Sequence, residues 1–113
     1  KFVKYFDYEG DDTVTGTVSL STSNDLTFDL KGMSGDHGFH IHTGKSCLES
    51  AGPHFYEGDT DGWTEVVISG DANGAVDPLF VNVSDVAGAY DFSENIDRTV
   101  VIHDAATPST KVS

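Results

Sequence analysis

The chain has 113 residues, 37% of them hydrophobic, which suits one domain with a modest core and is too short for two. Its 19 acidic and 6 basic residues give a formal net charge of −13, so nucleic acids and anionic membrane surfaces are poor partners for it. No run of 18 apolar residues is present, and the sequence therefore predicts a single domain over residues 1–113 without membrane insertion.

Short stretches of alternating residues follow one another along the chain. In the clearest of them, residues 14–21, apolar residues and glycine alternate with threonine and serine, the pattern of a half-buried strand. Residues 43–62 show no sustained period, and a loop of that length is usually functional. The predicted strands cover residues 2–8, 14–21, 26–31, 38–42, 63–69, 75–83 and 98–103. Seven short strands without a convincing helical period predict an all-β fold, an antiparallel sandwich or barrel.

Three of the five histidines lie within residues 38–55. If residues 38–42 form a strand, His40 and His42 share one face and leave the backbone roughly 7 Å apart, which suits two imidazoles converging on one metal ion. His54 follows a Gly-Pro turn and His103 ends the last predicted strand, so these two join the pair only if the fold makes their segments neighbours. Four imidazoles in a roughly planar arrangement select copper(II), whereas a tetrahedral set of nitrogen and sulfur ligands selects zinc.

These histidines lie in the motifs Gly-Phe-His-Ile-His (38–42), Ala-Gly-Pro-His-Phe (51–55) and Val-Val-Ile-His (100–103). Together with Cys47, an Asp-x-Asn-Gly hairpin turn (71–74) and Arg-Thr-Val-Val (98–101), they resemble the motifs of the copper/zinc superoxide dismutase family. The resemblance implies a Greek-key β-barrel, here with seven or eight antiparallel strands and a long metal-binding loop. It also implies the roles of individual histidines: His40, His42, His54 and His103 are the copper ligands and catalytic residues, and His37 resembles the structural histidine that braces the metal loop.

The differences from the family predict one copper ion per domain and no zinc. In the copper/zinc enzymes two more histidines and an aspartate follow the equivalent of His54, but no histidine lies between His54 and Trp63 here. The four ligands and His37 use all five histidines, and Asp59 with Asp61 could hold only a loosely bound hard cation. The family's electrostatic loop is also reduced, as in the copper-only branch known from secreted fungal enzymes and repeat proteins. The resemblance thus implies superoxide as the substrate and an extracellular or cell-surface location.

The family's last strand carries two functional residues that this sequence does not reach. One is a cysteine that pairs with the equivalent of Cys47, and the other is an arginine that guides the anion; this sequence ends at Ser113. We therefore expect a truncated last strand, or one repeat beside a neighbouring repeat domain in a longer chain. The absent arginine also leaves an alternative to a copper-only superoxide dismutase: a copper-binding or copper-buffering module, or an extracellular repeat domain, with little or no activity.

Without zinc, the second ring nitrogen of His54 needs another anchor. A metal-bound histidine usually donates its other N–H to a carboxylate or a carbonyl, and the family's copper-only branch is thought to use a carboxylate. Glu65, at the start of the predicted strand after the loop, is our first candidate for this anchor, with Asp59 or Asp61 behind it.

The charge of the protein opposes an anionic substrate at long range. Beyond a Debye length of about 8 Å at physiological salt this field is largely screened, so cations close to the site decide the approach. Lys45, Arg98 and Lys111 are the basic residues near the motifs, and we expect a structural role for Arg98. The sequence therefore predicts an open, shallow copper site with weak anion steering.

Overall fold

The computed structural model describes Tyr5, residues 14–33, 35–70, 76–77 and 80–103, and Lys111. The predicted turn at 71–74 and most of the predicted first strand and polar tail lie outside these residues. The strands are β1 (Thr15–Leu20), β2 (Asp25–Lys31), β3 (Gly35–His42), β4 (Val67–Gly70), β5 (Val76–Asp77), β6 (Phe80–Asn82) and β7 (Thr99–Ile102). They confirm the predicted all-β class.

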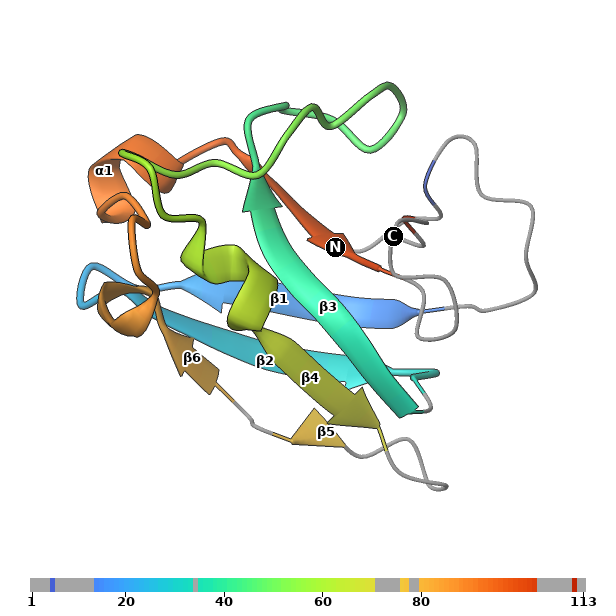
Figure 1. Ribbon diagram of the computed structural model, residues 1–113. Coiled ribbons are helices and arrows are strands. Elements are labelled where there is room, and N and C mark those ends of the chain that lie inside the picture. The colour runs from blue at the N-terminus through green and yellow to red at the C-terminus, as the bar shows by residue number, and fades with distance from the viewer. Residues whose placement is uncertain are drawn as a thin grey trace.

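The strands form two antiparallel sheets, which Figure 1 shows packed across each other. One sheet has the order β1-β2-β6 and the other the order β5-β4-β3-β7. The chain passes from one sheet to the other after β2, β5 and β6, so strands that follow each other in sequence are often not neighbours. As a result β3, the predicted histidine strand, lies between β4 and β7 in the interior of its sheet.

Residue alternation along the strands directs one face of each sheet into a shared core. In β2 the side chains of Leu26, Phe28 and Leu30 are buried, and those that alternate with them are more exposed. The Phe28 ring meets the Phe39 ring of β3 edge-on, with 4.4 Å between the ring centroids. Since successive side chains of a strand point to opposite faces, packing Phe39 into the core turns His40 and His42 of β3 to the other face.

The strand predicted over 63–69 is wrong in its first half. Gly62–Glu65 form a 3-10 helix, η1, and β4 begins after it. The Asp61 side chain caps this helix by accepting a hydrogen bond from the Trp63 backbone N–H at 3.1 Å. The turn places Trp63 in the interior, where it is fully buried and its Nε1–H donates to the Phe55 carbonyl at 3.0 Å. A capped turn with a buried tryptophan therefore outweighs the local β propensity.

The connections between the strands differ in how much regular structure they contain. The long loop after β3 is confirmed, since it extends without a regular element as far as η1. The segment 84–97, which lies between two predicted strands, contains most of a second 3-10 helix, η2 (Val83–Asp85), and one short helix, α1 (Phe92–Asn95). Among the described residues no helix is long and apolar enough to cross a membrane.

Candidate metal centre

β3 carries His40 and His42, and β7 runs along one of its edges. Residues 39–42 pair with β7 in antiparallel register. His103 follows β7 directly, and its backbone N–H donates to the Gly38 carbonyl at 2.9 Å. The sheet itself therefore places a third histidine beside the first two.

A short piece of the long loop returns along the other edge of β3. The Phe55 N–H donates to the Ile41 carbonyl at 2.7 Å, and the Thr43 N–H donates to the Pro53 carbonyl at 3.0 Å. An isolated antiparallel bridge between His42 and His54 completes this pairing. His54 is thus fixed by backbone hydrogen bonds to the ligand strand, although it lies in a loop.

The four histidines predicted as ligands converge at this place. One ring nitrogen of each lies within 4.8 Å of the others, and the Nε2 atoms of His42 and His103 are 3.2 Å apart. Two nitrogens bound at 2.0–2.1 Å to one ion are at most about 4.2 Å apart, so metal binding requires the widest pair to close by about 0.6 Å. The four histidine rings therefore converge as the metal-site hypothesis requires, with nitrogen-to-nitrogen distances slightly larger than in a metal complex.

The ring of His40 carries the clearest sign of a missing ligand. Its Nδ1 is buried and has no hydrogen-bond partner among the residues that the structure describes. An unpaired buried polar atom costs about 1–3 kcal/mol, and a metal ion at the centre of the cluster would satisfy it. His42 and His103 are 2% and 5% exposed, whereas the His54 side chain is 20% exposed. The donor set fits an ion that binds imidazole, such as copper, zinc or nickel.

Hydrogen bonds determine which nitrogen two of these rings can offer. His42 Nδ1–H donates to the Gly52 carbonyl at 2.7 Å, and His54 Nδ1–H donates to Asp61 Oδ2 at 2.7 Å. Each ring then presents the lone pair of Nε2 to the cluster. The structure therefore points to Nδ1 of His40 and to Nε2 of His42 and His54 as ligand atoms.

Burial keeps His40 and His42 neutral at physiological pH. It lowers the pKa of His40 to about 3, with smaller contributions from charge repulsion by His54, His103 and His42. Burial also lowers the pKa of His42 to about 4, although the hydrogen bond to the Gly52 carbonyl acts in the opposite direction. Neutral imidazole is the form that binds metals, so both rings are ready to do so without losing a proton.

We expect the metal-free protein to lose stability as the pH falls below about 6.5. The unfolded chain protonates His40 and His42 near their ordinary pKa of 6.5, whereas the folded protein does so only near 3 and 4. Protons therefore favour the unfolded state in this window, by up to about 2.7 kcal/mol per pH unit for the two groups together. Urea unfolding at several pH values measures this slope. A free energy of unfolding that stays constant from pH 6.5 to pH 4.5 would contradict the assignment.

The carboxylate beside His54 is Asp61, not our first candidate Glu65. Asp61 uses both oxygens, Oδ2 for the His54 ring and Oδ1 for the Trp63 N–H. Glu65 lies in η1 with an exposed side chain, and Asp59 is also exposed. The missed signal is an aspartate two residues before a large aromatic residue, a pattern that favours a capped turn over a strand.

His37 lies behind the cluster and contacts the strand of the last ligand. Its Nδ1–H donates to the His103 backbone carbonyl at 2.8 Å, in a buried position. This contact supports the end of β7, while the brace on the metal loop that the family resemblance implies stays a prediction. The Gly52 carbonyl was not predicted at all, because a backbone acceptor leaves no mark in the pattern of side chains.

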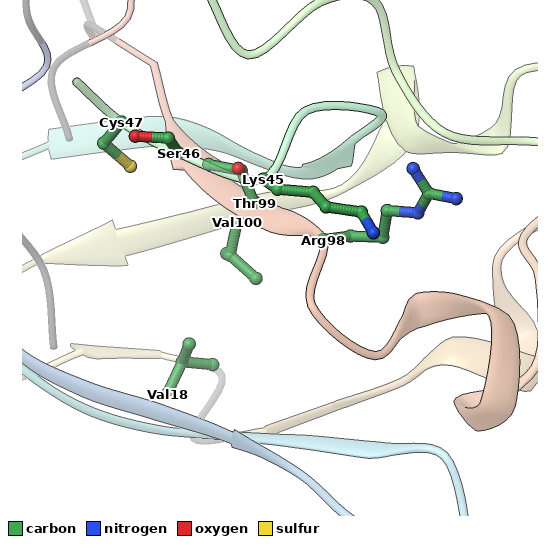
Figure 2. Close-up of a pocket in the computed structure, with 7 residues that line it drawn as sticks. All are labelled: Val18, Lys45, Ser46, Cys47, Arg98, Thr99 and Val100. Carbon is green, nitrogen blue, oxygen red and sulfur yellow. The ribbon is translucent and has the colours of Figure 1, made fainter. Parts of the chain in front are cut away.

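Two of the three basic residues near the motifs line a separate pocket. Lys45 and Arg98 line a pocket of about 230 Å³ between β1 and β7, next to the half-buried thiol of Cys47 (Figure 2). Arg98 donates from Nη1 to the Thr43 carbonyl at 2.7 Å, and its guanidinium carbon lies 4.3 Å from the centroid of the Phe55 ring. These contacts agree with a structural role for Arg98.

Among the basic residues that the structure describes, Lys111 is the one whose charge acts on a histidine of the cluster. Its backbone forms an isolated bridge with His103, and its ammonium group lies 5.5 Å from the centroid of the Tyr5 ring. After burial, which is the main cause, its positive charge is one of the contributions that lower the pKa of His42. An anion near the histidines would therefore meet the positive charge of Lys111.

Comparison with known proteins adds no family assignment: no family model, no curated protein and no solved structure matches this chain.

Proposed function

We propose that this domain is a copper-only superoxide dismutase, which converts two superoxide ions and two protons into oxygen and hydrogen peroxide. The observation that carries the proposal is the convergence of four imidazoles, one of which, His40, has a buried Nδ1 with no hydrogen-bond partner among the described residues. The order and spacing of the three histidine motifs, which resemble those of the copper/zinc superoxide dismutase family, favour copper over other ions that bind imidazole.

Each histidine has its own part in this proposal. A copper ion held by the four rings supplies one-electron chemistry, because imidazole suits both of its oxidation states. His40, His42 and His103 are buried on or beside sheet strands and hold the site rigid. His54, the most exposed of the four, faces the side from which solvent protons arrive. Asp61 keeps the proton of His54 on Nδ1, so that Nε2 stays available as a ligand.

The remaining features of the proposal rest on the family resemblance. We propose that the two sheets belong to a Greek-key barrel and that the domain acts outside the cell or at its surface, alone or beside a neighbouring repeat. We also propose one copper ion per domain and no zinc. Within the described part of the chain, the four histidines are the one group of three or more side chains that could hold a metal ion, and Asp61 is already bonded to His54.

The copper-loaded protein should show little rate enhancement at low salt. Its net charge of −13 repels superoxide over long distances, and Lys111 supplies local attraction that salt screens only weakly. We expect the second-order rate constant to change by less than about threefold between low and physiological ionic strength. Stopped-flow decay of superoxide measures it. A rate that climbs steeply as salt is removed would contradict the prediction.

A copper-buffering module is the second candidate, and the strongly acidic surface favours it because it opposes an anionic substrate. Copper-loaded protein and a His42→Ala variant, mixed with superoxide, separate the two functions. A dismutase removes superoxide catalytically, and its visible copper band bleaches and returns, while the variant does neither. Copper that binds tightly but is not cycled by superoxide would identify the buffering module. A protein that does not bind copper would exclude both.

A further inference from the structure

The part of the loop that carries Asp61 is fastened to a second loop by its backbone. Glu57 N–H donates to the Gly88 carbonyl at 2.7 Å, and Gly62 N–H donates to the Ala87 carbonyl at 2.9 Å. An isolated antiparallel bridge between residues 56 and 89 lies beside these two bonds. We call these pairings, of Tyr56, Glu57 and Gly62 with residues 87–89, the loop clasp.

Glycine allows the two backbones of the loop clasp to approach this closely. A Cβ on Gly88 would overlap the Thr60 carbonyl oxygen and lie 2.8 Å from the Glu57 carbonyl oxygen. A Cβ on Gly62 would lie 2.5 Å from the Ala87 carbonyl oxygen. These neighbours are backbone atoms, which cannot rotate away as the end of a side chain can, so a side chain at either position would push the segments apart.

Asp61 lies within the fastened segment, directly before Gly62. Its two carboxylate oxygens are committed to His54 Nδ1 and to the Trp63 N–H, both of which are held by other contacts. The carboxylate therefore reaches His54 only if the backbone of its segment keeps its present position. Bonds on both sides of Asp61, at Glu57 and Gly62, hold that backbone.

We propose that the loop clasp holds Asp61 within hydrogen-bond distance of His54, and that Gly88 is a positioning residue of the metal centre. Gly88 acts through the backbone of residues 57–62 and then through Asp61. The inference rests on the proposed function only where it concerns copper, because the hydrogen bond between Asp61 and His54 joins two side chains of this chain.

Gly88→Ala tests this proposal, and Gly58→Ala is a matched control. Both glycines have positive φ, +76° at Gly88 and +80° at Gly58, so both substitutions carry the same kind of backbone strain. Nothing lies within 4 Å of a Cβ on Gly58, whereas a Cβ on Gly88 meets the loop clasp. Gly88→Asn is a second variant, because asparagine tolerates positive φ but still carries a Cβ.

The first readout is the His54 Nδ1–H signal in the NMR spectrum of the metal-free protein. We expect it in the wild type and in Gly58→Ala, and we expect its loss by exchange in both Gly88 variants. The second readout is copper affinity, which should fall about 10-fold or more in the Gly88 variants, as for the loss of a partner behind a metal ligand. In an Asp61→Asn background, Gly88→Ala should lower copper affinity by no more than about twofold further.

Several results would overturn the proposal. One is a Gly88→Ala protein that keeps the His54 signal and binds copper as Gly58→Ala does. Another is a full additional loss of affinity in the Asp61→Asn background. If both Gly88 variants fail to fold while Gly58→Ala folds, the clasp supports the whole fold, and its specific role is also refuted. A wild-type protein that shows the His54 signal but binds no copper would refute the proposed function and leave the clasp to be decided by NMR alone.

Discussion

Replacing His40 by phenylalanine should lower copper affinity by more than about 100-fold and leave the metal-free protein at least as stable as the wild type. The variant removes one of the four ring nitrogens that converge. Its loss of copper affinity should therefore exceed the loss caused by removing a residue that only hydrogen-bonds to a ligand. The variant also removes the buried Nδ1, which has no hydrogen-bond partner in the part of the chain that the structure describes, and replaces it by apolar carbon. The free energy of unfolding should therefore stay constant or rise by up to about 1 kcal/mol. Competition with a copper chelator and urea unfolding measure the two effects.

His42→Phe is the matched control for this prediction. It removes a neighbouring ring from the same strand, but His42 Nδ1–H donates to the Gly52 carbonyl, which would lose its partner. This variant should lose copper and also lose about 1–3 kcal/mol of stability. If His40→Phe is destabilised as much as His42→Phe, or keeps its copper, then His40 Nδ1 does not face the metal.

Replacing Asp61 by asparagine should lower copper affinity by about 10-fold to 100-fold. An asparagine can still cap η1 through its amide oxygen, which accepts from the Trp63 N–H. It then presents an NH₂ group to His54 Nδ1, so the ring loses the acceptor that fixes its tautomer. Chelator competition measures the affinity, and thermal unfolding without metal shows whether the cap is preserved.

The other two carboxylates that the sequence proposed for this role provide the controls. Asp59→Asn and Glu65→Gln change exposed side chains on the same loop and on η1, and their copper affinity should stay within about twofold of the wild type. A Glu65→Gln variant that loses copper as Asp61→Asn does would restore the original assignment.

The sequence predicted the sheet elements better than the connections between them. Alternation in residues 14–21 and 26–31 reports burial on one face, and β1 and β2 lie where this pattern predicted them. At residues 62–65 the same approach failed, because a capping bond from Asp61 and the burial of Trp63 decide the conformation. Interactions of this kind depend on the tertiary structure and do not appear in a local pattern.

For the candidate metal centre, the sequence predicted the four histidines that converge, and it named Asp61 only behind Glu65. The shared face of His40 and His42 follows from strand geometry alone. The approach of His103 depends on the order of strands in the sheet, which the family resemblance implied and the residue pattern did not. The backbone carbonyl of Gly52 and the approach of Gly88 to Thr60 involve no distinctive side chain, so only the folded structure reveals them.

The three backbone segments that carry the histidines form one continuous hydrogen-bonded ribbon, with β3 in the middle. An ion held by all four rings would cross-link the three segments of this ribbon, which are far apart along the chain. Local opening of the segment around His54 would then require release of the ion, so its occupancy would control slow amide exchange on both sides of β3 at once. The backbone N–H groups of Phe55 and His103, on opposite edges of that strand, would gain protection from deuterium together, as one cooperative unit.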